Sequence, residues 1–297
     1  MDLCILYGES STQHDLFIEA AEKYFDTVTA IPITGTRVVD TEDGATVKYR
    51  NTDLSEFDAA FIRVFGSDML FGEQIPEILI DNGVYTQVDA DSLTIATNKF
   101  YAMKVLAEGG CSVPRSAYVL STEETEKGAE EFGYPVVIKL ISGYGGEGVM
   151  RASTASDLGP FVDTLTLFEQ DVCLQEYIDH PGEDIRVIVV GDETHSYKRV
   201  ATGEEEWRSN VAQGADRREF DAPEEVRETA VTAARLAGFD ICGVDMIQTE
   251  EDVYVIELNM SPGVPEETQE AVGADLPAVM MEYVHGQATR RASERGL

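Results

Sequence analysis

The chain has 297 residues, 43% of them hydrophobic, and a formal net charge of −34. This length predicts a globular protein of about two domains, since one domain typically takes about 150 residues. The 56 acidic residues against 22 basic ones argue against nucleic-acid binding by a basic face. No apolar run approaches the roughly 20 residues of a membrane span, so we predict neither a nucleic-acid nor a membrane partner.

The strong acidity predicts a halophilic surface, because crowded carboxylates repel one another until salt screens them. An acidic protein of ordinary salt tolerance is the alternative. The first residues, 1–8, carry no basic segment and predict a strand rather than a signal peptide. The four cysteines are scattered without a CxxC pair, which is typical of reduced thiols in a cytoplasmic enzyme.

The first third of the chain alternates between strand and helix patterns. We predict strands at 3–7, 28–32, 59–64 and 84–88, helices at 15–25 and 74–82, and a hairpin over 38–49 around Asp43-Gly44. This alternation predicts a small α/β domain over residues 1–94.

A second unit is predicted over residues 95–174, and its first helix begins after Asn98, a residue type that caps helices. Further predicted elements are helices at 122–132 and 155–167 and strands at 135–139, 149–152 and 172–178. A third unit over 175–286 is strand-rich from Asp184, then helical over 223–236 and 275–285. Residues 287–297 read as a frayed tail.

The most informative segment is an apolar hairpin over residues 241–259 with an acidic turn at 249–252. If Thr249 pairs with Val253, then Asp245 falls opposite Glu257.

Asn259, two residues beyond Glu257, then shares the face of both acids. Two buried and opposed carboxylates need a cation between them. An oxygen-only set of Asp245, Glu257 and Asn259 suits Mg²⁺, and Mn²⁺ is a possible substitute. A solvated outer face of the hairpin is the alternative explanation.

A Gly-rich loop over residues 142–148 lies between two predicted strands, so it is neither a Walker A loop nor a Rossmann turn. Its backbone N–H groups can still cover phosphates. Lys139 ends the preceding strand, where its ammonium needs an anionic partner. The strand 173–178 either presents its backbone to an adenine edge or is an ordinary core strand.

Arg186 enters an apolar strand over residues 184–190. It either pairs structurally with Asp184 or Glu183, or faces a phosphoryl group that is being transferred. The segment Trp207-Arg208-Ser209-Asn210 adds a second arginine and an amide. The four histidines are isolated, and the chain contains no HExxH or GxSxG motif, so zinc and serine-hydrolase chemistry lack support.

Taken in order, these motifs resemble the ATP-grasp superfamily and, within it, the RimK-type amino-acid ligases. The resemblance covers residues 97–284 and rests on the Gly-rich hairpin, Gln-Glu-Tyr-Ile, Asp-Ile-Arg-Val, Arg-Ser-Asn, Gly-Val-Asp and Glu-Leu-Asn-Met-Ser-Pro-Gly. It implies an α/β fold: a pre-ATP-grasp domain (1–94), a small lobe with a Gly-rich lid (95–174) and a large lobe with the metal site (175–286).

The resemblance also implies a role for each matching residue. Phosphate contacts fall to Lys99, Lys139 and the lid glycines Gly143, Gly145 and Gly146; adenine contacts to Glu176, Tyr177 and Ile178; the ribose contact to Asp184; the transferring phosphoryl to Arg186; Mg²⁺ to Asp245, Glu257 and Asn259; and the acyl-phosphate and incoming amino acid to Arg208 and Asn210.

The implied reaction is an ATP-dependent amide ligation through an acyl-phosphate, with glutamate as the favoured amino acid. Its carboxyl acceptor is either a protein C-terminus or a small molecule, as in a cofactor glutamyl ligase or a peptide-forming ligase. A non-catalytic nucleotide-binding protein is a third possibility, and a homo-oligomer is possible.

Overall fold

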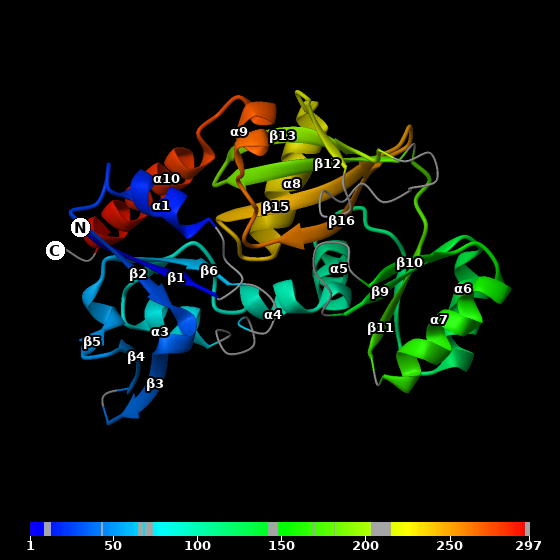
Figure 1. Ribbon diagram of the computed structural model, residues 1–297, viewed down its shortest axis with the longest axis horizontal. Helices are drawn as coiled ribbons and strands as arrows, with labels where there is room; N and C mark the ends of the chain where they lie inside the picture. The colour runs from blue at the N-terminus through cyan, green and yellow to red at the C-terminus, as the bar shows by residue number, and fades with distance from the viewer. Residues whose placement is uncertain are drawn as a thin grey trace.

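The computed structural model describes all residues except 9–12, 43, 65–67, 69–73, 142–147, 169, 181, 203–214 and 295–297. The described residues form two four-stranded sheets, one five-stranded sheet and one three-stranded sheet. Figure 1 shows the N-terminal sheets at one end of the molecule, the five-stranded sheet at its centre and the remaining four-stranded sheet at the other end. The predicted mixed α/β class is confirmed.

The N-terminal sheet is parallel, in the order β2-β1-β6-β7, and is built from β1 (Asp2–Tyr7), β2 (Thr27–Pro32), β6 (Ala59–Arg63) and β7 (Tyr85–Thr86). Helices α1 (His14–Ala21) and α3 (Ile75–Asp81) accompany it. The predicted hairpin is confirmed as β3 (Thr36–Thr41) with β4 (Gly44–Tyr49), extended by β5 (Thr52–Asp53). Two 3₁₀ turns cover Ile33–Gly35 and Leu54–Glu56.

The second four-stranded sheet, in the order β10-β9-β11-β8, is antiparallel and carries two helices, α6 (Thr122–Phe132) and α7 (Ala155–Leu167). Its strands are β8 (Ser116–Val119), β9 (Val136–Leu140), β10 (Val149–Ala152) and β11 (Val172–Glu176). Helices α4 (Ser92–Thr97) and α5 (Lys99–Glu108) precede it. The predicted cap is confirmed, because the Asn98 side chain accepts a hydrogen bond from the Tyr101 N–H at 2.9 Å.

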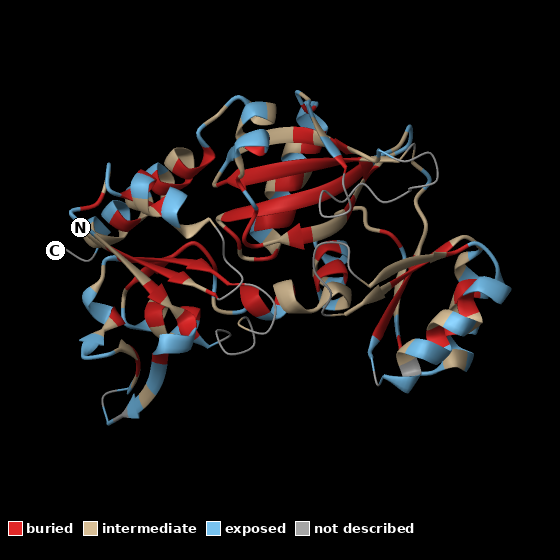
Figure 2. Ribbon diagram, in the orientation of Figure 1, coloured by how far each residue is buried: buried red, intermediate tan, exposed pale blue. Residues whose placement is uncertain are grey.

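The five-stranded sheet, in the order β14-β13-β12-β15-β16, forms the centre of the molecule. Its strands are β12 (Glu183–Val190), β13 (Glu193–Val200), β14 (Asp216–Glu219), β15 (Ile241–Gln248) and β16 (Val253–Asn259). Helices α8 (Glu224–Leu236) and α9 (Glu266–Val272) lie beside it. Figure 2 shows β12 and β15 buried along nearly their whole length, as their apolar sequences require.

The C-terminal helix corrects one prediction. Residues 287–297 were expected to be a frayed tail after a helix ending at 285, but α10 runs from Leu276 to Glu294. Val284 and Ala288 are buried on its inner face, in one cluster with Phe17 of α1. This packing offsets the cost of ordering the last turns, which composition alone does not reveal.

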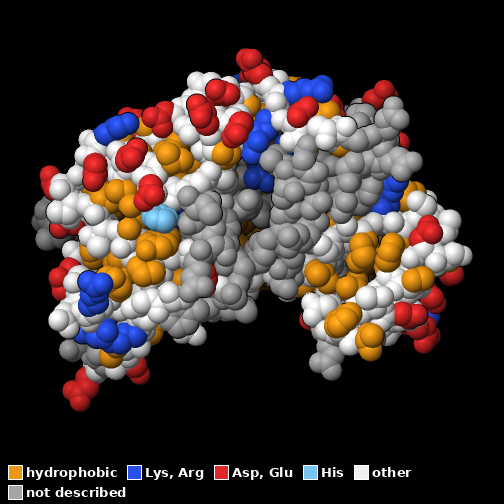
Figure 3. Space-filling model, in the orientation of Figure 1, with side chains coloured by type: hydrophobic (Ala, Val, Ile, Leu, Met, Phe, Trp, Pro, Cys, Tyr) orange, Lys and Arg blue, Asp and Glu red, His pale blue; other side chains and the backbone are white. Residues whose placement is uncertain are grey.

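All four cysteines are free thiols, and Cys4, Cys173 and Cys242 are buried. Within the described ranges, no helix combines the length and the apolar content needed to cross a membrane. Figure 3 shows acidic side chains spread over the visible face rather than gathered in one patch. The unit boundaries at residues 94 and 174 stay a prediction.

Candidate active site

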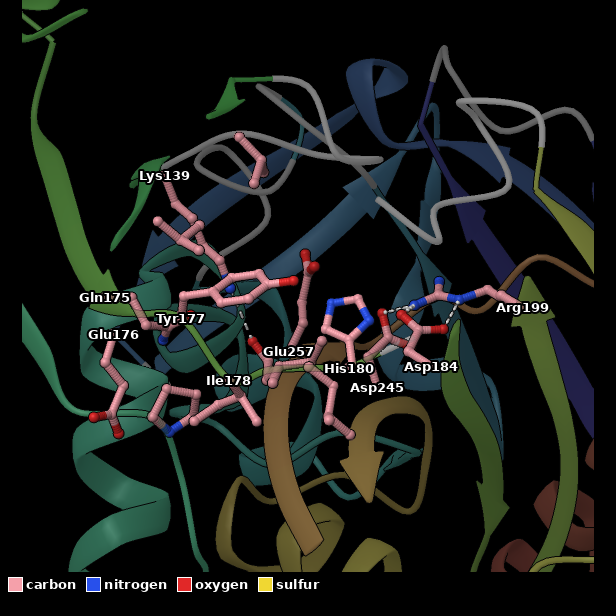
Figure 4. A pocket seen from close by; sticks show the side chains of 15 residues that line it. Lys139, Gln175, Glu176, Tyr177, Ile178, His180, Asp184, Arg199, Asp245 and Glu257 are labelled. Atoms are coloured by element: carbon pink, nitrogen blue, oxygen red, sulfur yellow. Dashed lines mark hydrogen bonds and ion pairs between the residues drawn. The ribbon is translucent and has the colours of Figure 1, made fainter. Parts of the chain in front are cut away.

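A pocket lies between the four-stranded antiparallel sheet β10-β9-β11-β8 and the five-stranded sheet (Figure 4). Residues from β9, β10, β11, β12, β13, β15 and β16 converge on it. It is lined by Pro114, Val137, Lys139, Val149, Gln175, Glu176, Tyr177, Ile178, His180, Asp184, Arg199, Asp245, Ile247, Ile256 and Glu257. The pocket therefore combines aliphatic walls with a cluster of charged groups.

A β-bulge places the two predicted metal-binding carboxylates opposite each other. The hairpin pairs Gln248, not Thr249, with Val253, and this register would bring Asp245 opposite Ile256. The register shifts between Asp245 and Met246, where Ile256 is the extra residue of β16, so that Asp245 pairs with Glu257 as predicted, but by a different route. Without the extra residue, Glu257 would point to the other face of the sheet. Gly243 pairs with Asn259 two residues further along.

Asp245 is 2% exposed, which rules out the solvated-hairpin explanation. Arg186 donates from Nε and Nη2 to its two carboxylate oxygens, and Arg199 Nη2 lies 2.9 Å from Oδ2. Burial would raise the pKa of Asp245, but these two guanidinium groups outweigh it and lower that pKa. Burial would likewise lower the pKa of Arg186, yet Asp245 raises it.

Glu257 is held by a second set of cations. Lys99 Nζ donates to Glu257 Oε1 at 2.8 Å. Burial would raise the pKa of Glu257, but the Lys99 ammonium outweighs it and the pKa is lowered. Lys139 Nζ reaches the carbonyl of the bulge residue Ile256 at 3.4 Å, and burial lowers the pKa of this lysine.

The charges of this cluster do not cancel. Asp184, Asp245 and Glu257 supply three negative charges, while Arg186, Arg199, Lys99 and Lys139 supply four positive ones. One positive charge is left in a chain whose net charge is −34. Such a centre favours an anionic ligand.

Arg199 is the residue that sequence reasoning missed. Its Nε and Nη2 donate to Asp184 Oδ1 and Oδ2 at 2.7 and 2.5 Å, while Nη2 also reaches Asp245. The suggested structural pair of Arg186 with Asp184 or Glu183 is therefore wrong: Asp184 binds Arg199, and Glu183 binds Lys198. The signal in the sequence was the spacing of two residues between Tyr197 and Arg199, which places both on one face of a strand. In β13 this face is buried.

The predicted adenine contacts lie at the end of β11. The Glu176 carboxylate turns to Arg115, accepting from its backbone N–H at 2.8 Å and from its Nε at 2.5 Å. The Glu176 N–H also donates to the Arg115 carbonyl. Tyr177 and Ile178 follow the last residue of the strand and line the pocket. The Glu176 side chain is therefore engaged with Arg115, and the adenine contacts stay a prediction.

The three proposed metal ligands fit a hard divalent cation by their chemistry. All are oxygen donors on one face of β15 and β16. The Asn259 Oδ1 accepts from the Ser261 N–H at 3.1 Å, which orients the amide. The described residues contain no group of three or more His, Cys, Asp or Glu placed to hold a metal, which is consistent with a set that includes an amide and relies on a ligand to complete it.

Some predicted site residues cannot be placed. Gly143, Gly145 and Gly146 of the lid, and Arg208 and Asn210, lie outside the described residues. The other ten predicted residues are described: seven line the pocket, and Lys99, Arg186 and Asn259 lie beside it as hydrogen-bond or strand neighbours of the carboxylates.

Comparison with known proteins identifies the family. A family model described as RimK-like ATP-grasp domain matches residues 96–284. A relative from Enterobacter sp. (strain 638), named probable alpha-L-glutamate ligase, is 32% identical over 248 residues, which cover 82% of each chain. A relative of the same name from Maridesulfovibrio salexigens is 29% identical over 250 residues, covering 84% of this chain and 83% of the relative.

Among solved structures, the ATP-grasp ligase PsnB complexed with a phosphomimetic variant of minimal precursor, Mg and ADP has a TM-score of 0.73 at 17% identity. The match covers 96% of this chain and 98% of that chain, and it confirms the predicted ATP-grasp fold. Because the family model matches well over half of the sequence, the chain belongs to the RimK-like ATP-grasp family.

Proposed function

We propose that this protein joins glutamate to a carboxyl acceptor in an ATP-dependent reaction. Its family membership makes it an ATP-dependent ligase that forms carbon–nitrogen bonds. The names of its two relatives support glutamate as the added amino acid. The observation that carries the proposal is the cationic cluster around two opposed carboxylates in one pocket, of which Asp245 is buried and Glu257 is partly buried.

The pocket suggests how ATP lies. Aliphatic walls from Val137, Val149, Ile247 and Ile256 can enclose a base beside the Tyr177–Ile178 backbone. The phosphates then point toward the lysines and arginines around Asp245 and Glu257. We propose that backbone N–H groups of the lid glycines bind these phosphates and that the lid excludes water.

We propose that Asp245, Glu257 and Asn259 hold Mg²⁺ once the nucleotide is present. Phosphate oxygens can then accept the hydrogen bonds that Arg186 donates to Asp245 and Lys99 donates to Glu257. The carboxylate oxygens become available to the metal. When bound, Mg²⁺ neutralises charge on the β- and γ-phosphate oxygens. Mn²⁺ would accept the same oxygen set. The Mg and ADP present with PsnB support this assignment.

The ligation proceeds in two balanced steps. An acceptor carboxylate oxygen attacks the γ-phosphorus, the bond from that phosphorus to ADP breaks, and an acyl-phosphate forms. The glutamate amine then attacks the acyl carbon, inorganic phosphate leaves, and the amine loses a proton as the amide forms. We propose that the planar Arg186 guanidinium stabilises the charge spread over the transferring phosphoryl group. Arg208 and Asn210 are proposed to border the acyl-phosphate and the incoming amino acid.

We propose a peptide or protein C-terminus as the acceptor, with a small-molecule carboxylate as the alternative. The precursor bound to PsnB supports a peptide-like acceptor. The test is incubation of the purified protein with Mg-ATP, glutamate and a cell extract at molar KCl. We expect ADP release that depends on glutamate, and mass spectrometry should find an acceptor heavier by whole glutamate residues.

Glu257→Ala should lose this ADP release, and its matched control is Glu251→Ala, which removes an exposed carboxylate from the turn of the same hairpin. It should release ADP at the wild-type rate. Full ADP release without any glutamylated product would contradict the ligase assignment, and products confined to small molecules would replace the peptide acceptor by the alternative. A cytoplasmic, halophilic setting and a homo-oligomeric state remain part of the proposal.

A further inference from the structure

His180 lies in the turn between β11 and β12, at the wall of the pocket. Its ring centroid is 5.7 Å from that of Tyr177, with the ring planes tilted by 37°. Figure 4 shows the imidazole between the Tyr177 ring and the Asp184 carboxylate. His180 therefore stands midway between the end of the pocket where a base fits and the charged end where phosphates fit.

The backbone of the turn determines which ring nitrogen carries the proton. The Gly182 N–H donates to His180 Nδ1 at 3.2 Å. Gly182 has φ +75°, a left-handed conformation that glycine adopts without steric cost. A nitrogen that accepts a hydrogen bond has no proton of its own, so the neutral ring carries its proton on Nε2. Burial lowers the pKa of His180, which favours this neutral form.

Asp184, the acid expected to bind ribose, is already engaged. Both of its oxygens accept from Arg199, and the side chain is almost fully buried. A carboxylate of this kind can accept from one ribose hydroxyl, but it cannot donate. The neighbouring hydroxyl of the same sugar needs a different partner, and the Nε2–H of His180 is a donor at the right place along the pocket.

We propose that His180 is a nucleotide-binding residue that donates its Nε2 proton to one ribose hydroxyl, while Asp184 accepts from the other. The inference rests on the proposed function, because it requires the pocket to hold a nucleotide. The turn sequence Asp179-His180 places the ring against Tyr177, so one residue orients the sugar and also supports the aromatic wall beside the base.

The test is calorimetric titration of the full-length protein with Mg-ADP, 2′-deoxy-ADP and 3′-deoxy-ADP. His180→Ala should weaken ADP binding about three- to tenfold, the scale of one neutral hydrogen bond. One of the two deoxy nucleotides should bind wild type and variant equally, because it lacks the hydroxyl in question. His180→Phe, which keeps a ring beside Tyr177 but has no donor, should lose as much as His180→Ala.

The matched control is His195→Ala, which removes a histidine of β13 that faces Glu193 and does not line this pocket; its ADP affinity should equal that of wild type. Equal losses for all three nucleotides, full recovery in His180→Phe, or unchanged ADP affinity in His180→Ala would each overturn the inference. If wild type binds no ADP at all, the proposed function fails together with it.

Discussion

The molecule buries arginines in two regions and treats them differently. At the end of the N-terminal sheet, the guanidinium of Arg63 lies over the Phe17 ring at 4.3 Å and over the Phe61 ring at 6.0 Å, and donates to the Pro262 carbonyl at 3.3 Å. In the five-stranded sheet, Arg186 and Arg199 bind carboxylates. Burial lowers the pKa of Arg63 to about 9, whereas Asp245 raises that of Arg186 against the effect of burial.

The difference separates an arginine that ties two parts of the fold together from a pair that we propose to be functional. Arg63 ties the N-terminal sheet to the loop that follows Asn259, and a second tie is the Val264 N–H bond to Gln13 Oε1 at 2.9 Å. Arg186 and Arg199 instead hold ionised carboxylates that would otherwise be too costly to bury. An incoming phosphate can compete for those guanidinium groups, so their pairing is exchangeable in a way that a contact with aromatic rings is not.

The largest expected effect is that of Glu257→Ala. It removes a proposed metal ligand and the partner of Lys99, and we expect turnover to fall by at least about 10³-fold, more than the loss of a single transition-state donor. The measurement is ADP release at saturating Mg-ATP, with circular dichroism to show that the fold is retained. Wild-type-like turnover would remove the carboxylate set from the mechanism.

Arg186→Lys tests the functional pair directly. Lysine keeps the charge but loses the planar fork, so turnover should fall by at least about 10²-fold, the scale of one transition-state donor. ADP affinity should change little. If ADP affinity alone falls, Arg186 is a contact of the bound nucleotide and not a group that acts on the transferring phosphoryl.

Gly243→Ala perturbs Arg186 without replacing it. A Cβ at this position would lie 2.9 Å from Arg186 Nη1 and 3.1 Å from its Cδ. The guanidinium must therefore shift, and we expect turnover to fall about tenfold or more if Arg186 acts as proposed, because small misplacements of a catalytic group are costly. Gly159→Ala, where the new Cβ would meet nothing within 4 Å, is the control and should leave turnover unchanged.

Arg63→Ala tests the arginine at the N-terminal sheet and should affect stability rather than nucleotide binding. Truncating a large buried side chain should lower the free energy of unfolding by about 2–4 kcal/mol. ADP affinity should stay within about twofold of wild type, within the error of a surface change, because Arg63 does not line the pocket. Denaturant unfolding and ADP titration of the same preparation provide both values. If the variant instead lost ADP affinity by as many kcal/mol as it lost stability, the purely structural role of Arg63 would be refuted.

The smallest effect concerns the surface and no single site. The Debye length falls from about 10 Å at 0.1 M salt to about 3 Å at 1 M, so repulsion within a chain of charge −34 should fade over that range. Melting temperature should rise toward molar KCl, and NaCl should act nearly as well. A melting temperature that stays flat between 0.1 and 2 M salt would contradict the halophilic prediction and leave the site assignments untouched.

Local patterns were sufficient for much of the fold. The helix at 122–132, the strand at 149–152 and the helix at 155–167 have the predicted bounds, and Asn98 caps α5 as expected. These elements follow from periodicity and capping, which act over a few residues. The α10 extension was missed because its last turns are stabilised by contacts with α1, far away in the sequence.

The sequence by itself determined the family and the residue types of the site: two acids and an amide at fixed spacing, lysines before a Gly-rich loop, and an arginine in an apolar strand. Only the tertiary structure decided how they are used. The bulge at Ile256 brings Glu257 to the face of Asp245, and Arg199 joins Asp245 to Asp184 across three strands. Register and side-chain pairing depend on contacts between strands distant in the chain, which a local pattern does not contain.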